Sequence, residues 1–422
     1  MTKKIMRKWH RRISRISAMA TALLTSVLMV ACGGESDNVQ TSQWVASWYV
    51  AQQNYNEPLT PLNIPAPPPV TISNQTVRQI VHVSYGGTQA RVKLSNLFNT
   101  TPVAFTAVRV ARNTGGGGID TGSDQLATFS GASTVTLAPG AEVWSDAVNI
   151  SFPSESDLAI SIFVQQPTQV VSSHTIASET NFLVSGNQAS ASTLTNSTTF
   201  NSYYWVEGID VRTSDNVKVV VAFGDSITDG YASTVNLNHR WPNRLDDRLK
   251  ATPDAKISVV NSGIGGNRWL HDQYGQNGVD RFSRDVLGVS GATDVFILLG
   301  INDIGLGNVY APQYVKADQV IAAISNAAAK AKAQGLKVYL GTLTPYQGSA
   351  ISNADGESER QAINAFIRSA TNVDGIVDFD KALQDPSNPT KLLGLYDSGD
   401  HIHPNDAGYQ AMGNAVNLSF AQ

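Results

Sequence analysis

The sequence places a serine at a position that suits a nucleophile. The stretch VKVVVAFGDSITDG, residues 217–230, runs from an apolar segment directly into Gly224-Asp225-Ser226. A serine hydroxyl is a poor nucleophile until a base takes its proton and hydrogen-bond donors stabilise the oxyanion that forms. Ser226 is therefore a candidate catalytic residue only if distant segments supply a base and such donors.

A candidate base lies near the C-terminus, in DSGDHIHPNDAG, residues 397–408. Asp400 and His403 are three residues apart, just before the proline that is expected to start the last helix. On a tight turn, this spacing allows the carboxylate to hold one imidazole nitrogen while the other faces the serine. We interpret His401 as an exposed neighbour of this pair.

Two further segments offer oxyanion donors. The run Ser262-Gly263-Ile264-Gly265-Gly266-Asn267 follows the apolar stretch KISVVN. Its glycines allow a backbone N–H to approach a ligand closely. Asn302 follows the apolar stretch DVFILLG, and its side-chain amide is a second candidate donor.

Two plainer interpretations compete with the catalytic one. Ser226 would fit the cap of a helix that follows a strand, with no chemical role. The cluster near the C-terminus also contains residue types that bind zinc, namely Asp400, His401, His403 and Asp406. No metal-ligand motif accompanies them elsewhere in the sequence, so we expect no metal and no cofactor.

The segments that carry these residues alternate between two patterns. Apolar strands are predicted at 217–223, 256–261, 294–300, 337–343 and 375–379, and helices at 312–334 and 404–418. Repeated strand–helix alternation predicts a parallel sheet covered by helices on both faces. Functional residues of such sheets gather at the carboxyl ends of the strands, where Ser226 is placed.

In this order, FGDSITDG, NSGIGGN, LLGIND and DHIHPN resemble the motifs of the GDSL or SGNH hydrolases. The resemblance implies a flavodoxin-like three-layer α/β/α domain. It implies Ser226 as nucleophile, His403 as base and Asp400 as the carboxylate that holds the base. The implied oxyanion donors are the Ser226 N–H, the Gly266 N–H and the Asn302 side chain. Gly266 is preferred to Gly263 and Gly265 by counting five residues on from Asn261.

The preceding residues, 43–215, have the texture of an all-β domain, for which a sandwich or jelly roll is expected. Period-two alternation appears at 80–94, 103–111 and 158–165, and the glycine pair Gly86-Gly87 inside the first run predicts a hairpin. The phrases WVASW, GIGGNRWLHD and YDSGDHIHPNDAGY also resemble a two-domain exported subgroup of the same hydrolases, with a β domain before the hydrolase domain. We therefore predict a β domain at 43–215 and a hydrolase domain at 216–422.

The N-terminus predicts export. Seven basic residues within the first 15 are followed by an apolar run, 18–31, that is too short to span a membrane. The run ends at Cys32, the single cysteine, followed by two glycines. This resembles the signal of a bacterial lipoprotein, with residues 1–31 as signal, Cys32 as the lipid-bearing residue and 32–42 as a tether. An ordinary cleaved signal is the alternative.

Removal of the signal leaves 23 basic and 34 acidic residues, a net charge of −11. This argues against nucleic acid as a partner, since such binding requires a basic surface. We expect contact with membrane only through the lipid anchor, and a location in the bacterial cell envelope or, without the anchor, in the medium.

Together these features predict an exported serine esterase that works through an acyl-enzyme. The polar loops around the site favour short acyl chains on polar or carbohydrate-like alcohols, and Trp269, Tyr231 and Tyr346 are candidates to line the pocket. A lipase or lysophospholipase and an O-acyl transferase with the same triad are alternatives. A non-catalytic polysaccharide-binding lipoprotein is an alternative of another class.

Overall fold

The computed structural model describes residues 41–57, 67–252 and 255–421. The predicted signal and Cys32 lie outside these ranges. In the part of the chain that is described, no helix combines the length and the apolar character needed to cross a membrane.

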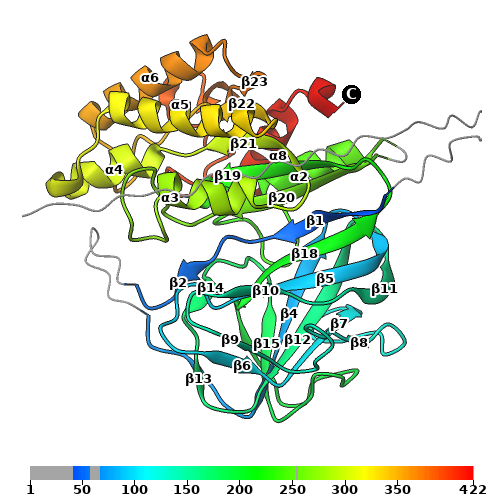
Figure 1. Ribbon diagram of the computed structural model, residues 1–422. Helices are drawn as coiled ribbons and strands as arrows, with labels where there is room; N and C mark the ends of the chain where they lie inside the picture. Colours follow the sequence, from blue (N-terminus) through cyan, green and yellow to red (C-terminus); the bar gives the residue numbers. More distant parts are fainter. Residues whose placement is uncertain (1–40, 58–66, 253–254, 422) are drawn as a thin grey trace, which may run out of the picture. The chain divides into compact units, whose positions relative to one another are not determined.

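Among the described residues, those from Gln43 to Thr213 form antiparallel sheets (Figure 1). One sheet has the order β1 (Gln43–Tyr49), β18 (Val206–Thr213), β5 (Gly87–Ser95) and β10 (Glu142–Trp144), with β11 (Val148–Phe152) also paired to β5. The other has the order β16 (Thr198–Phe200), β15 (Asn181–Ser185), β4 (Gln75–Val83), β12 (Ser156–Val164), β7 (Ala107–Arg112) and β8 (Gln125–Leu126). Alternate apolar residues of both sheets share one hydrophobic core. The region is therefore all-β, as predicted.

Shorter strands complete this region. They pair as β13 (Thr168–Gln169) with β3 (Thr71–Ile72), as β6 (Val103–Phe105) with β9 (Val135–Leu137), and as β14 (Ser172–His174) with both β17 (Tyr203–Tyr204) and β2 (Gln53–Asn54). The β14 group holds side chains that reach the site described below.

The predicted hairpin at Gly86-Gly87 is wrong. Its two strands form as expected, but β4 belongs to one sheet and β5 to the other. The chain crosses between the sheets at Gly86, where a Cβ would lie 2.4 Å from the backbone nitrogen of Ser154. Alternation reports which face of a strand is buried, and it does not identify the partner strand.

From Lys218 onward the chain forms a parallel sheet of order β20 (Ile257–Gly263), β19 (Lys218–Gly224), β21 (Ala292–Leu298), β22 (Lys337–Gly341) and β23 (Gly375–Val377). This is the flavodoxin-like order 2-1-3-4-5. The order reverses between β19 and β21, and ligands of such sheets bind where it reverses.

Helices cover this sheet (Figure 1). They are α1 (Ser226–Asp229), α2 (Trp241–Lys250), α3 (Gly278–Phe282), α4 (Ile301–Val309), α5 (Ala317–Ala333), α6 (Ala354–Ser369), α7 (Phe379–Leu383) and α8 (Asp406–Ala415). Helix α2 packs against α8, and α5 packs against α6. Because α2 and α5 join strands that step in opposite directions, right-handed crossovers place them on opposite faces. The three-layer α/β/α prediction is confirmed.

Shorter elements complete the C-terminal part. They are a π-helical turn at Ser283–Leu287, 3-10 turns at Ala311–Gln313 and Leu418–Ala421, and the strand pair β24 (Gln384–Asp385) and β25 (Asn388–Leu392). The first 3-10 turn holds Pro312, which explains why α5 begins later than predicted.

Strand β1 joins the β region to the parallel sheet. Its N–H at Ala46 donates to Ser290 O at 2.9 Å, and the Ser258 hydroxyl of β20 donates to Ala46 O at 2.7 Å. The side chains of Val45, Ala46 and Tyr49 are buried in the same hydrophobic cluster as the strands of the parallel sheet. The antiparallel region thus contributes to the core beneath the candidate site.

Candidate active site

Ser226 lies at the carboxyl end of β19, as the first residue of α1. Asp225 caps this short helix, because its Oδ1 accepts from Ile227 N at 3.0 Å. Gly224 is required by space, since a Cβ there would lie 2.5 Å from Leu298 O on the neighbouring strand. The Gly-Asp-Ser sequence therefore builds a sharp strand-to-helix turn that presents the serine hydroxyl at the edge of the sheet.

His403 and Asp400 meet this serine. The Ser226 Oγ and His403 Nε2 are 2.8 Å apart, and His403 Nδ1 lies 2.6 Å from Asp400 Oδ2. The other carboxylate oxygen of Asp400 accepts from the backbone N–H of His403 at 2.9 Å and of Ile402 at 3.1 Å. Partial burial alone would raise the pKa of Asp400, but these hydrogen bonds outweigh it and hold the pKa well below its usual value. The carboxylate is thus ionised at neutral pH and orients the ring.

The other members of the proposed metal cluster point elsewhere. His401 Nδ1 pairs with Asp397 Oδ2 at 2.6 Å, and its side chain is 54% exposed. Asp406 binds His239 Nδ1 at 2.6 Å. Within the described ranges, no three His, Cys, Asp or Glu side chains are grouped so that they could hold a metal ion. The structure brings His403, and not His401, to the serine.

The three glycines of the loop after β20 differ in the hydrogen bonds that their backbone N–H groups make. Gly263 N donates to Asn261 Oδ1 at 2.8 Å, and Gly265 N donates to Asp229 Oδ2 at 2.9 Å. In the described part of the chain, the backbone N–H of Gly266 has no partner, and neither has that of Ser226. Of the three glycines, Gly266 alone retains a free donor, which agrees with the residue preferred from the spacing.

Asn302 contributes to the site from the first turn of α4. Its Nδ2 donates to Asn267 O at 3.1 Å, which leaves the second amide hydrogen available. The neighbouring Asp303 accepts from the backbone N–H of Trp269 at 2.8 Å and of Leu270 at 3.1 Å. Asp303 therefore fixes the loop that follows Gly266.

Two buried carboxyl groups lie close to the nucleophile. Burial raises the pKa of Asp225 and of Asp303 to about 7 in each case, although backbone hydrogen bonds oppose the shift. Both groups are partly protonated near neutral pH. Each group therefore carries less negative charge at neutral pH than an ordinary carboxylate does.

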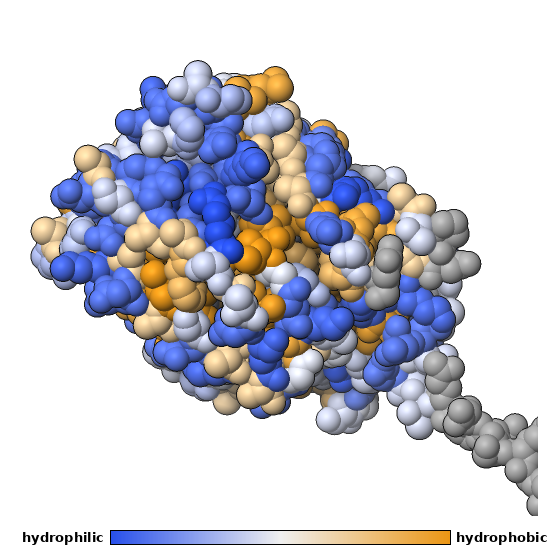
Figure 2. Space-filling model, turned by 90° about the horizontal axis from the view of Figure 1, so that it is seen from above, coloured by the Kyte–Doolittle hydropathy of each residue, from blue (hydrophilic) through white to orange (hydrophobic). Residues whose placement is uncertain are grey.

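The candidate catalytic groups lie at a cavity of about 750 Å³. The candidate catalytic groups that face it are Ser226, Gly266, Asn302, Asp400 and His403. Much of the remaining wall is apolar and includes Pro67, Ile176, Leu306, Ala350, Ile351 and Ile402. Figure 2 shows one face of the molecule, on which hydrophobic groups are visible between mainly hydrophilic ones.

Of the three aromatic candidates, only Tyr231 lies at this cavity. It is 45% exposed, and its ring centroid is 4.5 Å from that of His403. Trp269 is fully buried, packs against Phe223 and donates from its indole nitrogen to Leu299 O at 2.9 Å. Tyr346 is also fully buried. These two residues are core residues that do not line the cavity, so packing accounts for them.

Sequence reasoning missed the wall that the β region supplies. Gln53, Asn54, Tyr55, Glu57, Pro67, Thr175 and Ile176 all face the cavity. These residues form no motif and lie more than 45 positions before Ser226. No local signal could have identified them, because only the packing of β2 and β14 brings them to the site.

The comparisons agree with this geometry. Residues 222–411 match the model of the GDSL-like Lipase/Acylhydrolase family. No match was found among curated proteins.

Similar solved structures include three esterases or lipases. A GDSL-like lipase from Bacteroides thetaiotaomicron is 24% identical, with 47% of this chain and 85% of that chain covered and a TM-score of 0.36. An acetyl xylan esterase is 22% identical, with 47% and 96% covered and a TM-score of 0.39. A carbohydrate acetylesterase family member from Sinorhizobium meliloti is 19% identical, with 47% and 95% covered and a TM-score of 0.37.

The matched residues contain the turn that presents Ser226, the loop of Gly266, the amide of Asn302 and the segment of His403. Residues 222–411 are therefore a GDSL-like lipase/acylhydrolase domain, preceded by antiparallel β sheets, and the protein is a carboxylic ester hydrolase.

Proposed function

We propose that Ser226, His403 and Asp400 carry out ester hydrolysis through an acyl-enzyme. The observation that supports this most is the chain of hydrogen bonds Ser226–His403–Asp400 on the wall of a cavity. Beside it lie two backbone N–H groups that have no partner among the described residues. His403 removes the hydroxyl proton as Ser226 Oγ attacks the ester carbonyl. The tetrahedral intermediate collapses with cleavage of the ester C–O bond, and His403 returns the proton to the leaving alcohol.

The oxyanion is held by the Ser226 N–H, the Gly266 N–H and the Asn302 amide. Such donors are effective because they are fixed before the reaction and need no reorganisation as charge develops. A water molecule then enters, His403 removes its proton, and the acid leaves as the serine recovers its hydrogen. The nucleophile of the first step, the base and the oxyanion donors all come from side chains and backbone of the chain, and water is the second nucleophile.

A serine in the same cavity provides a matched control. Ser349 also lines the cavity, and among the described residues its buried hydroxyl has no hydrogen-bond partner. We expect Ser226→Ala to fold normally and to lose about 10³-fold or more in kcat towards p-nitrophenyl butyrate. Ser349→Ala should keep kcat within about threefold. A fluorophosphonate should label Ser226 in the wild type. Equal activity of the two variants would refute the assignment of the nucleophile.

The cavity refines the substrate that we propose. Polar loops favour a polar or carbohydrate-like alcohol, whereas the apolar wall of Ile176, Leu306 and Ile351 suits an apolar acyl group larger than acetyl. We therefore propose esters of short to medium chains, with the highest kcat/KM near butyrate to octanoate. A methylene that cannot be accommodated should cost about 1–3 kcal/mol in the transition state. A soluble ester series below micelle-forming concentrations tests this, and a maximum at dodecanoate or longer would instead favour a lipase or lysophospholipase.

Transfer to an alcohol uses the same residues. Product analysis with a competing acceptor alcohol distinguishes the two reactions, because an O-acyl transferase forms a new ester in preference to the free acid. We propose hydrolysis as the main reaction.

A further inference from the structure

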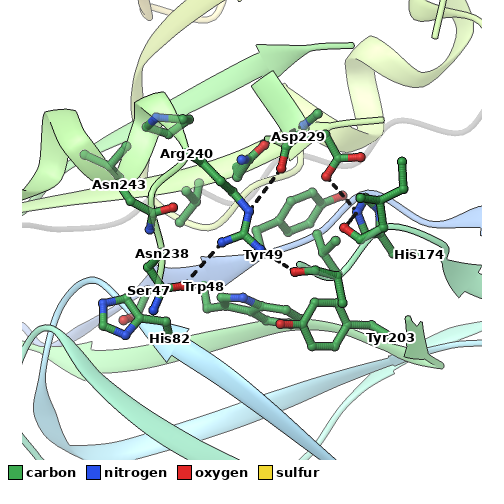
Figure 3. Close-up of a pocket in the computed structure, with 18 residues that line it drawn as sticks. Ser47, Trp48, Tyr49, His82, His174, Tyr203, Asp229, Asn238, Arg240 and Asn243 are labelled. Atoms are coloured by element: carbon green, nitrogen blue, oxygen red, sulfur yellow. Dashed lines mark hydrogen bonds and ion pairs between the residues drawn. The ribbon is translucent and has the colours of Figure 1, made fainter. Parts of the chain in front are cut away.

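A buried hydrogen-bonded pair links the β region to the helix of the nucleophile. His174 is the last residue of β14, and Asp229 is the last residue of α1, three positions after Ser226. The His174 Nε2 and Asp229 Oδ1 atoms are 2.9 Å apart, and their side chains are only 2% and 5% exposed. Figure 3 shows the pair beside Arg240, whose Nε donates to Asp229 O at 3.0 Å. Neither residue belongs to the catalytic scheme above.

Both ring nitrogens of His174 lie within hydrogen-bonding distance of a partner. Its Nδ1 lies 2.9 Å from Ala51 O, and its Nε2 also lies 3.1 Å from Ile176 O. Carbonyl oxygens only accept hydrogen bonds. Both ring nitrogens therefore face hydrogen-bond acceptors, and Asp229 shares Nε2 with one of these carbonyls.

Asp229 connects His174 to the glycine-rich loop that contains Gly266. While Oδ1 faces His174, Oδ2 accepts from Gly265 N at 2.9 Å. Gly265 is bonded directly to Gly266, the residue with the free N–H. Ile176, two residues after His174, also lies against this loop. A Cβ added at Gly265 would be only 2.4 Å from Ile176 Cδ1. The loop is thus held by the carboxylate that His174 orients and is covered by Ile176.

We propose that His174 is a positioning residue for the reaction: it fixes Asp229, and Asp229 sets the place of the Gly265–Gly266 peptide in the oxyanion hole. This rests on the proposed function and extends it to the β region. His174 should affect the stability of the transition state and not the binding of the ester, because the oxyanion forms only when the serine attacks. Loss of the pair should therefore lower kcat with little change in KM.

Two substitutions separate this role from simple support of the fold. In His174→Gln, the amide nitrogen occupies the level of Nε2, so it keeps a donor towards Asp229. In His174→Asn, the nitrogen occupies the level of Nδ1, so it keeps the bond to Ala51 O and loses Asp229. With p-nitrophenyl butyrate, we expect His174→Gln to stay within about threefold of wild-type kcat. We expect His174→Asn to lose about tenfold or more, with KM within about threefold; the full loss of an oxyanion donor, about 10²–10³-fold, is the ceiling.

The opposite pattern overturns the proposal. If His174 only anchored β14 to Ala51, Asn would rescue and Gln would not. Equal kcat for both variants and the wild type would also overturn it. His82, another β-region histidine paired with carboxylates, is the matched control, and its Asn and Gln variants should share the kcat of the wild type.

A second variant covers the case in which His174→Asn does not fold, as judged by its melting transition. Asp229→Asn keeps the shape and an acceptor, but it cannot offer a charged oxygen to both His174 and Gly265. Its kcat should fall by about tenfold, and unchanged kcat would overturn the proposal. Ser226→Ala, assayed in parallel, keeps the two questions apart. If it retained activity, the proposed function would fail, whereas an inactive Ser226→Ala with wild-type kcat in Asp229→Asn removes only the role of His174.

Discussion

Replacement of Gly266 by alanine tests the oxyanion hole at a residue whose backbone conformation and surroundings leave little room for a Cβ. Gly266 has a φ of +73°, and an added Cβ would lie 2.3 Å from Cδ1 and 2.6 Å from Cγ of Tyr274. The left-handed conformation costs a residue with a Cβ about 1–2 kcal/mol. The clash adds a cost typical of an overfilled core, about 1–3 kcal/mol, unless the loop moves. Movement of the loop relieves the strain and withdraws the N–H from the oxyanion.

We therefore expect Gly266→Ala to lose about 10²–10³-fold in kcat, as for the removal of one oxyanion donor. Gly335→Ala is the matched control. Gly335 has a φ of +83°, lies just after α5, and a Cβ there would meet no described atom within 4 Å. This variant should lose about 1–2 kcal/mol of stability with kcat unchanged. Ester hydrolysis and thermal melts of both variants give the comparison. If Gly266→Ala kept kcat within about threefold while melting earlier, Gly266 would not be an oxyanion donor.

Asn302→Ala should cost about 10²–10³-fold in kcat, since it removes another donor; a loss below threefold, measured in the same assay, would exclude the amide. His403→Ala should abolish hydrolysis while His401→Ala retains most of it, and the reverse result would transfer the role of base. Burial alone would lower the pKa of His82, but hydrogen bonds to two carboxylates raise it to about 9, so the stability they add is complete below about pH 6.5 and is lost as the pH rises through 9. Melts at both ends of this window should show a drop that is smaller in a His82→Gln variant, and equal drops would refute the pairing. Cys32→Ser should release the protein from the membrane fraction or block its processing, and a variant that stayed membrane-bound and fully processed would favour an ordinary signal.

Much of the parallel sheet was predictable because each strand is a short apolar run that ends at or near a glycine or a helix cap. The residues at the strand ends, Ser226, Gly266 and Asn302, could be assigned to one rim because parallel strands end at the same edge of a sheet. The segment of His403 was identified by the spacing of the histidine from its carboxylate. These features depend on local sequence, and the structure brings the side chains together.

The missed features depend on contacts between segments that lie far apart in the sequence. The apolar wall of Pro67 and Ile176, and the pair of His174 with Asp229, join residues that share no motif. Alternation likewise revealed β4 and β5 and could not show that they belong to different sheets. Trp269 stands next to a catalytic motif in the sequence, yet its side chain points into the core, because proximity along the chain does not determine the direction of a side chain.

Strand β1 has a consequence for the order in which the protein folds. It is made early, but its partner in the antiparallel sheet is β18, where Gln43 pairs with Thr213, and it also bonds to Ser258 and Ser290 of the hydrolase domain. Contacts between such distant positions require long loops to close before they add stability, which slows folding. The edge of β1 must stay unpaired until most of the chain is available. The site is therefore completed late. A chain truncated so that it lacks the β region would lose both β1, which supports the core beneath the site, and the wall that faces the substrate.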